Sequence, residues 1–279
     1  MRTTVKKKKG GRSLSRTRRK ESANVHPTAI VAPTTQLGEG VSIGPWAVIG
    51  EHVSIGAGTS IGPHVVIDGW TEIGRGCRIF PHAVLGTEPQ DLKFHGEKSY
   101  LYIGDHTVIR EFATVNRGTA SGGGKTVVGN YTFIMAYAHV AHDCFLGDHV
   151  ILANAATLGG HVTIEDYAIV GGLCGVHQFC RIGKYALVGG CSAVNQDIPP
   201  FIKAQGNRPE LYGLNGVGLR RHGFSRETLQ KLRRAYRLLF HSGLNTSEGM
   251  ARVEEEVRDC PEVTYLVQFI KFSQRGITR

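Results

Sequence analysis

The chain has 279 residues and a formal net charge of +10, a length that allows one large domain or two modest ones with a real core. Glycine accounts for 37 residues without a collagen period, and a hydrophobic content of 41% argues against a disordered chain. Because no apolar run approaches the ~18 residues of a membrane span and the N-terminus lacks an apolar signal segment, we expect neither a membrane-spanning nor a secreted protein.

The positive charge is concentrated in residues 1–22. This segment holds ten Lys and Arg residues against the single acid Glu21, so it carries +9 of the +10. Low hydrophobicity and self-repulsion predict a disordered tail. Its composition would suit an arm for nucleic acid or an anionic surface, or a transit peptide without the usual apolar stripe. Since runs of charge are usually solvated extensions, we expect no nucleic-acid partner.

A hexapeptide period dominates residues 23–200. Every sixth residue is Val, Ile or Leu from Val31 to Leu85, again over 103–115, and again over 128–194, which makes 25 positions without an exception. Glycine usually follows the aliphatic residue. The period predicts short strands joined by corners at which glycine adopts positive φ, with three hexapeptides to each triangular coil. Such coils stack at ~4.8 Å with the aliphatic side chains inside, as a parallel β-helix.

Two polar, glycine-rich insertions interrupt the period, at 86–102 and 116–127. Loops that leave a regular scaffold often carry function, although a few apolar residues in each could simply pack it onto the surface. The six cysteines include no CxxC pair. We therefore expect reduced cysteines, no cysteine metal site and a cytoplasmic protein.

The period stops after Val194, and residues 201–279 form a linker and a small helical domain. Residues 201–223 are expected to be irregular and basic. A helix should begin after the N-cap Ser225 and end near Gly243, with further helices over 247–258 and 262–272. This domain would cap one end of the coil.

Histidines gather where the repeat loses its glycines, in the hexad AHVAHD at 138–143. Since one coil is three hexapeptides, positions 160 and 178 stack on His142, which places His161 and His177 along the same corner. With Asp143 beside it, a histidine here could serve as a general acid or base. Three histidines could instead hold zinc, or the polar residues could merely face water. The coincidence with the lost glycines favours a functional site.

Outside the tail, the whole chain resembles the UDP-N-acetylglucosamine O-acyltransferases of bacterial lipid A biosynthesis, a family of hexapeptide-repeat enzymes. The stretches that carry the resemblance include QDLKF at 90–94, NRGT at 116–119, AHVAHDC at 138–144, VHQFC at 176–180, AQGN at 204–207 and GLRRHGFS at 218–225.

The resemblance implies a left-handed parallel β-helix with a small C-terminal α-helical domain, assembled as a homotrimer with active sites between neighbouring prisms. It implies transfer of an (R)-3-hydroxyacyl group from acyl carrier protein to the 3-hydroxyl of UDP-N-acetylglucosamine. The expected partners are the carrier protein and this sugar nucleotide. No metal or organic cofactor is implied beyond the carrier's phosphopantetheine.

The resemblance also assigns roles to residues. His142 would be the general base, Asp143 would support it, and the N–H of Gly160 would hold the oxyanion. The sugar nucleotide or acyl chain would be contacted by Gln90, Asp91, Lys93, His139, His161, His177 and Gln178. The nucleotide phosphates would be bound by Asn215 and Arg221.

Two positions bear on the length of the acyl chain. Gly190 stands where the family uses glycine to leave room for a longer chain, and Arg208 replaces the histidine that usually accompanies it. His222 also departs from the family, which commonly has a second arginine there. The acyl length is therefore left open.

Four alternatives remain at this point. A γ-class carbonic anhydrase would use the same trimeric left-handed β-helix, with three histidines from two chains converging on zinc. The insertion at 86–102 and the helical C-terminus fit an acyltransferase better. The N-acyltransferase of the same pathway has an additional N-terminal domain, for which residues 1–22 are too short. A variant with a 3-amino sugar as acceptor, in which an amine replaces the acceptor oxygen, is also left open. A non-catalytic scaffold would leave the histidine cluster unexplained.

One further surface suits the carrier protein. The first C-terminal helix is expected to be basic, and an acidic carrier would bind such a face, although an ordinary solvated helix would look the same. Its basic residues are Arg226, Lys231, Arg233, Arg234 and Arg237.

Overall fold

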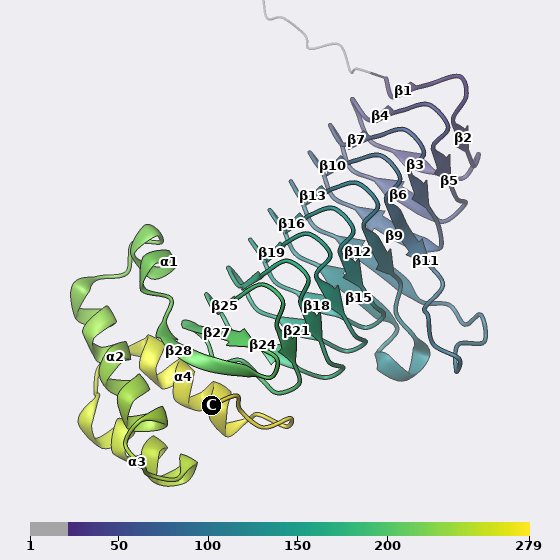
Figure 1. The fold of residues 1–279 in the computed structure, drawn as a ribbon. Coiled ribbons are helices and arrows are strands. Elements are labelled where there is room, and N and C mark those ends of the chain that lie inside the picture. Colours follow the sequence, from purple (N-terminus) through teal and green to yellow (C-terminus); the bar gives the residue numbers. More distant parts are fainter. Residues whose placement is uncertain (1–21) are drawn as a thin grey trace, which may run out of the picture.

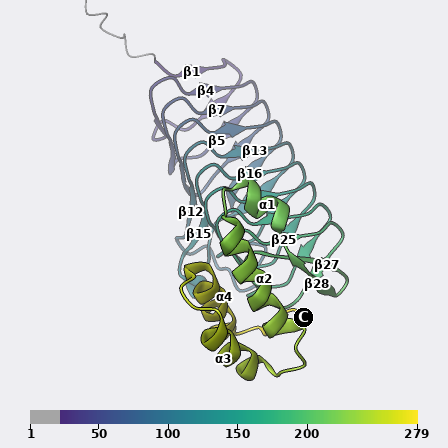
Figure 2. The same ribbon diagram turned by 90° about the vertical axis from the view of Figure 1, so that its left-hand side faces the viewer.

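The structure, a computed structural model, describes residues 22–279, so the predicted tail lies outside the described residues except for Ser22. Most of the chain winds into a left-handed parallel β-helix whose triangular coils stack along one axis (Figure 1). The helices lie at the end of the stack that is opposite to β1 (Figures 1 and 2). The predicted fold class is confirmed.

Three sheets form the faces of the prism. Sheet A contains β1 (Asn24–Val25), β4 (Ser42–Ile43), β7 (Ser60–Ile61), β10 (Arg78–Ile79), β13 (Val108–Ile109), β16 (Phe133–Ile134), β19 (Ile151–Leu152), β22 (Ile169–Val170), β25 (Leu187–Val188), β27 (Ile202–Gly206) and β28 (Pro209–Leu214). Sheet B contains β2 (Ile30–Val31), β5 (Val48–Ile49), β8 (Val66–Ile67), β11 (Val84–Thr87), β14 (Thr114–Asn116), β17 (His139–Val140), β20 (Thr157–Leu158), β23 (Gly175–Val176) and β26 (Ala193–Val194). Sheet C contains β3 (Gln36–Leu37), β6 (Val53–Ile55), β9 (Trp70–Ile73), β12 (Tyr100–Ile103), β15 (Lys125–Val128), β18 (Phe145–Leu146), β21 (Thr163–Ile164) and β24 (Arg181–Ile182).

The register follows the predicted coil of three hexapeptides, as in the pairing of Ile151 with Ile169. Of the 25 aliphatic positions of the repeat, 23 are buried, and the two in the first coil, Val31 and Leu37, are partly buried against the same core. The core is therefore one continuous column of aliphatic side chains. This rigid column fixes the height of every corner residue along the axis.

The role predicted for the repeat glycines is wrong. The residues with positive φ are mostly not glycine and lie three positions after the aliphatic residue, as at His64 and Asp143. The glycine that directly follows the aliphatic residue is needed because the next coil comes very close. A Cβ on Gly56 would lie 2.5 Å from the carbonyl carbon of Gly74 in the next coil. The repeat thus selects glycine for close approach of backbones rather than for its φ angle.

The insertions leave the prism on one side as segments 88–99 and 117–124, because β11, β12, β14 and β15 extend into the ranges predicted to be loops (Figure 1). The second contains the 3₁₀ turn η1 (Ala120–Gly122). Arg117 ties the two together: its guanidinium donates to the carbonyl oxygen of Gly86 at 3.0 Å and lies 5.2 Å from the centre of the Phe94 ring. The insertions therefore form one unit against the prism.

The expectation that residues 201–223 are irregular is also wrong. Strand β27 extends sheet A in parallel beside β25, and β28 returns antiparallel to it. The alternation explains this, because Ile202 and Ala204 point into the core while Lys203 is exposed. A short helix, α1 (Gly216–Arg221), follows.

The three later helices form where they are predicted. They are α2 (Arg226–Phe240), α3 (Thr246–Glu256) and α4 (Pro261–Lys271). The hydroxyl of Ser225 accepts from the Thr228 N–H at 3.0 Å and caps α2, as expected. Together the helices enclose a second hydrophobic core beyond the last coil. No helix within residues 22–279 combines the length and the apolar character needed to cross a bilayer.

Candidate active site

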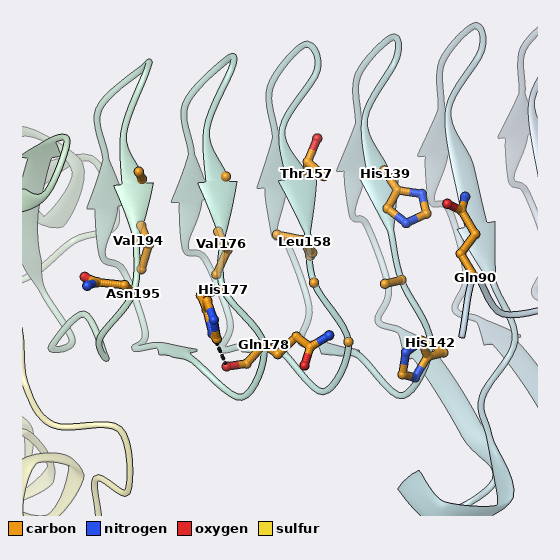
Figure 3. A pocket seen from close by; sticks show the side chains of 15 residues that line it. Gln90, His139, His142, Thr157, Leu158, Val176, His177, Gln178, Val194 and Asn195 are labelled. Carbon is orange, nitrogen blue, oxygen red and sulfur yellow. Dashed lines mark hydrogen bonds between the residues drawn. The ribbon is translucent and has the colours of Figure 1, made fainter. Parts of the chain in front are cut away.

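A groove of about 540 Å³ runs along the face of sheet B in the C-terminal half of the prism. Successive coils contribute its wall, from β17 to β26, and segment 88–99 contributes Gln90 at one end (Figure 3). The polar side chains that line it are those of Gln90, His139, His142, Thr157, His177, Gln178 and Asn195. Six of the fourteen predicted site residues therefore meet in the groove: Gln90, His139, His142, Gly160, His177 and Gln178.

His142 and Asp143 form a hydrogen-bonded pair at the corner that follows sheet B. Nδ1 of His142 lies 2.8 Å from Oδ2 of Asp143, and the aspartate side chain is 0% exposed. Asp143 occupies the left-handed region with φ of 59°, which aspartate tolerates better than most residues. Its N–H donates to Oγ1 of Thr126 at 2.8 Å. Because a carboxylate only accepts, Nδ1 of His142 carries the proton, and Nε2 has no hydrogen-bond partner among residues 22–279.

His161 lies one coil further, beside this pair. Its Nε2 is 3.9 Å from Oδ2 of Asp143, and its ring stands edge-on to that of His142 with the centroids 5.2 Å apart. Burial lowers the pKa of His161, although the nearby carboxylates of Asp143 and Asp91 oppose this. The same cause lowers the pKa of His139, whose Nδ1 lies 2.7 Å from Oγ1 of Thr114. Both histidines are thus biased towards the neutral form.

Gly160 faces the His142 ring directly. A Cβ at this position would lie 2.7 Å from Nε2 and 2.6 Å from Cε1 of His142. Its N–H forms no hydrogen bond within residues 22–279. A free backbone donor beside a free imidazole nitrogen is the combination that acyl transfer requires.

The predicted ladder of three histidines is only partly assembled. His177 lines the groove, but its Nδ1 lies 3.1 Å from the Gln178 carbonyl oxygen (Figure 3). The guanidinium of Arg275 lies 3.2 Å from the same nitrogen. In the part of the chain that the structure describes, the ligand atoms that gather within 4.8 Å belong to His142, Asp143 and His161. That is not the set of three histidines that the zinc hypothesis needs.

Segment 88–99 also carries the predicted residues Asp91 and Lys93. Oδ1 of Asp91 accepts from the Lys93 N–H at 3.0 Å, which orients the Asp91 carboxylate. Asp91 is close enough to His161 for its charge to act on that imidazole, while Lys93 is exposed.

Asn215 and Arg221 lie on a different corner, between sheets C and A. Asn215 caps α1, since its Oδ1 accepts from the Gly218 N–H at 3.3 Å and its Nδ2 donates to the Tyr185 carbonyl oxygen at 3.0 Å. Arg221 is exposed at the end of α1. Next to it, the ring of His222 stands 5.3 Å from that of Tyr185. Within one chain these residues do not meet His142.

Gly190 and Arg208 lie at the third corner, between sheets A and B. Gly190 is exposed in the turn between β25 and β26, and Arg208 is exposed in the turn of the β27–β28 hairpin. The Gly206 N–H donates to Oγ of Ser192 at 3.0 Å, which holds the hairpin turn beside Gly190. The structure thus brings these two positions together at one edge of the groove-bearing face.

The comparisons with known proteins show to which family the chain belongs. Residues 52–87 and 125–160 match the family model for bacterial transferase hexapeptide repeats, and residues 197–278 match that for domain 2 of UDP-N-acetylglucosamine O-acyltransferase. An acyl-[acyl-carrier-protein]–UDP-N-acetylglucosamine O-acyltransferase of Halorhodospira halophila is 48% identical over 91% of this chain and 99% of its own length. The chain belongs to the UDP-N-acetylglucosamine O-acyltransferase family. The predicted resemblance is therefore confirmed.

Two further members of the UDP-N-acetylglucosamine O-acyltransferase family support the assignment. The protein with the same name from Thiobacillus denitrificans is 49% identical over 92% of this chain and 100% of its own. The crystal structure of the UDP-N-acetylglucosamine O-acyltransferase of Moraxella catarrhalis superposes with a TM-score of 0.89 at 42% identity, covering 91% of this chain and 99% of that one.

Two residues of this family member escaped the sequence prediction. Thr119 donates two hydrogen bonds to Asp143, and Arg275 contacts His177. The NRGT stretch at 116–119 marked Thr119 as part of the resemblance but indicated no partner for it. Arg275 follows the last helix, where the period gives no guide to position.

Proposed function

We propose that this chain transfers an (R)-3-hydroxyacyl group from acyl carrier protein to the 3-hydroxyl of UDP-N-acetylglucosamine, the first step of lipid A biosynthesis. The observation that carries the proposal is the His142–Asp143 pair, whose free Nε2 faces Gly160 in an open groove. The names of the relatives give the acyl-[acyl-carrier-protein] donor, UDP-N-acetylglucosamine and O-acyl transfer.

His142 acts as the general base. Its Nδ1–H donates to the buried Asp143 carboxylate, so Nε2 carries the lone pair that accepts the proton of the sugar 3-hydroxyl. As this proton leaves, the sugar oxygen attacks the thioester carbonyl carbon. The negative charge that develops on the carbonyl oxygen accepts a hydrogen bond from the Gly160 N–H. Collapse of the tetrahedral intermediate breaks the carbon–sulfur bond, and the imidazolium returns its proton to the departing thiolate.

The groove supplies the substrate contacts. Segment 88–99 carries Gln90, Asp91 and Lys93, of which Gln90 lines the groove. The coils contribute His139, His177 and Gln178 to its lining, with His161 beside the His142–Asp143 pair. In this proposal they bind the sugar nucleotide and the acyl chain. His161 and His139 serve as neutral hydrogen-bonding groups, because burial lowers the pKa of each. No cofactor is required apart from the phosphopantetheine of the carrier.

A homotrimer completes the site. Asn215 and Arg221 lie on another corner of the prism from His142, so they can bind the phosphates of the same nucleotide only if they come from a neighbouring chain. Gly190 and Arg208 flank the groove-bearing face and would limit the acyl chain. The basic face of α2 would receive the acidic carrier protein. In this proposal the enzyme acts in the cytoplasm, where free cysteines such as these stay reduced.

The activity is tested by incubating the purified protein with (R)-3-hydroxyacyl carrier proteins of several chain lengths and UDP-N-acetylglucosamine. Formation of the 3-O-acyl product at one preferred length is expected. Transfer only to the 3-amino analogue of the sugar would contradict the proposed acceptor, and no transfer to either acceptor would contradict the proposed activity.

The shared site is tested by mixing chains. An intact site would combine His142 of an Arg221→Ala chain with Arg221 of a neighbouring His142→Ala chain. Trimers reassembled from equal amounts of the two variants should therefore contain about a quarter of the native number of intact sites. Each variant alone should be nearly inactive. Mixed trimers no more active than the single variants would show that both residues serve the same chain.

A further inference from the structure

Segment 117–124 covers the carboxylate of Asp143. A Cβ on Gly122 would lie 2.0 Å from Cγ of Asp143, so the carboxylate packs directly against the backbone of this segment. Thr119 reaches it twice, because its N–H donates to Oδ1 at 2.9 Å and its hydroxyl lies 2.6 Å from Oδ2. The glycine-rich insertion thus excludes water from the group that orients the proposed base.

The direction of the hydroxyl hydrogen bond follows from chemistry. An ionised carboxylate can only accept, so the 2.6 Å contact requires Thr119 to donate its hydroxyl proton to Asp143. Oγ1 of Thr119 in turn accepts a hydrogen bond from the Gly122 N–H at 3.2 Å, and Oγ of Ser121 lies 3.1 Å from it. Thr119 is itself 2% exposed. Its hydroxyl is therefore fixed on every side.

We propose that Thr119 is a positioning residue for the acyl transfer: it holds the Asp143 carboxylate in the one orientation in which Oδ2 faces Nδ1 of His142. This inference rests on the proposed function of the His142–Asp143 pair. Oδ2 accepts from both the Thr119 hydroxyl and Nδ1, whereas Oδ1 accepts from the Thr119 N–H. Rotation of the carboxylate would break all three contacts at once.

Loss of the hydroxyl should have two effects. The imidazole should lose its alignment, which lowers kcat. The charge of Asp143 should also be less compensated, which stabilises the imidazolium and raises the pH at which the enzyme loses activity on the acid side. Within residues 22–279, the other ionisable groups that interact with the pair are His161, His139, Cys144 and, through His161, Asp91. The substitution leaves all of them in place.

Thr119→Val removes the hydroxyl at nearly constant volume, and Thr119→Ser retains it. We expect Thr119→Val to lower kcat about 10- to 100-fold, with KM for the sugar nucleotide within about twofold of the wild type. The acid limb of its pH–rate profile should move to higher pH, and Thr119→Ser should remain close to the wild type. Thr132→Val is the matched control, because that buried hydroxyl donates only to the Gly147 carbonyl oxygen on another corner.

Two further measurements keep the test decisive. Should Thr119→Val fail to fold, Gly122→Ala displaces Asp143 while leaving the hydroxyl intact and should lower kcat similarly. In histidine-labelled protein, the NMR signals of the His142 ring should move in Thr119→Val, a change that needs no turnover to be seen. If the wild type is active and Thr119→Val keeps both its kcat and the His142 signals, this inference alone is overturned. A wild type without transfer would refute the proposed function, while the His142 signals would still decide the role of Thr119.

Discussion

Gly160→Ala should disable the enzyme without unfolding it. The new Cβ would lie 2.7 Å from Nε2 of His142, whereas an ordinary contact needs about 3.4 Å, so the ring must move by about 0.7 Å. A displacement of about 1 Å at a catalytic group can cost about 100-fold in rate. Gly160 does not have a positive φ, so alanine brings no backbone strain. We expect kcat to fall about 100-fold at an unchanged melting temperature.

The measurement is steady-state acyl transfer together with thermal unfolding. Gly172→Ala is the matched control, because Gly172 holds the same turn position on another corner and a Cβ there would lie 3.2 Å from the Asn154 carbonyl oxygen. This control should keep both its rate and its stability. Full activity in Gly160→Ala would refute the reasoning that catalysis depends on the close approach of Gly160 to Nε2 of His142.

Three other predictions follow from the geometry. Burial lowers the pKa of His139 and His161 below the ordinary value of 6.5, so the unfolded chain binds more protons. The free energy of unfolding should therefore fall as the pH drops through about 6.5. In urea titrations at several pH values, His161→Gln should show a smaller fall in the free energy of unfolding. If its pH dependence matched that of the wild type, His161 would not be a source of the fall. Gly56→Ala should destabilise the fold by about 1–3 kcal/mol, because the Cβ meets the backbone of the next coil; a wild-type melting temperature would disprove the close-approach explanation. Gly190→Met, at an exposed turn, should shift transfer to shorter acyl chains, and an unaltered chain-length profile would remove Gly190 from the acyl site.

The architecture could be predicted because a repeat of six leaves few alternatives. Each aliphatic residue such as Leu152 or Ile164 must point inward, and three hexapeptides per coil then fix which residues stack. The period alone therefore predicts that His161 lies near His142, as the structure confirms. The reason why glycine occurs in the repeat could not be predicted, because the period shows only its position. It does not show whether a positive φ angle or a neighbouring backbone requires glycine there.

The site could be predicted only as far as the period reaches. His177 shares the corner, yet its ring contacts Arg275 from the C-terminal segment, which no repeat positions. The role of Thr119 could not be predicted either, because the repeat does not fix how an insertion aligns with the coils. The contact between Thr119 and Asp143 depends on tertiary packing. The hairpin of β27 and β28 was missed because the hexapeptide pattern ends before it, although the inward Ile202 continues sheet A.

The most direct test of the account compares wild-type protein and His142→Ala in transfer from (R)-3-hydroxyacyl carrier protein to UDP-N-acetylglucosamine. If His142 is the general base, kcat should fall by about 100- to 10,000-fold, with the trimer intact and KM for the sugar nucleotide little changed. Wild-type turnover in the folded variant would contradict the account, because the His142–Asp143 pair could then not be the group that accepts the proton.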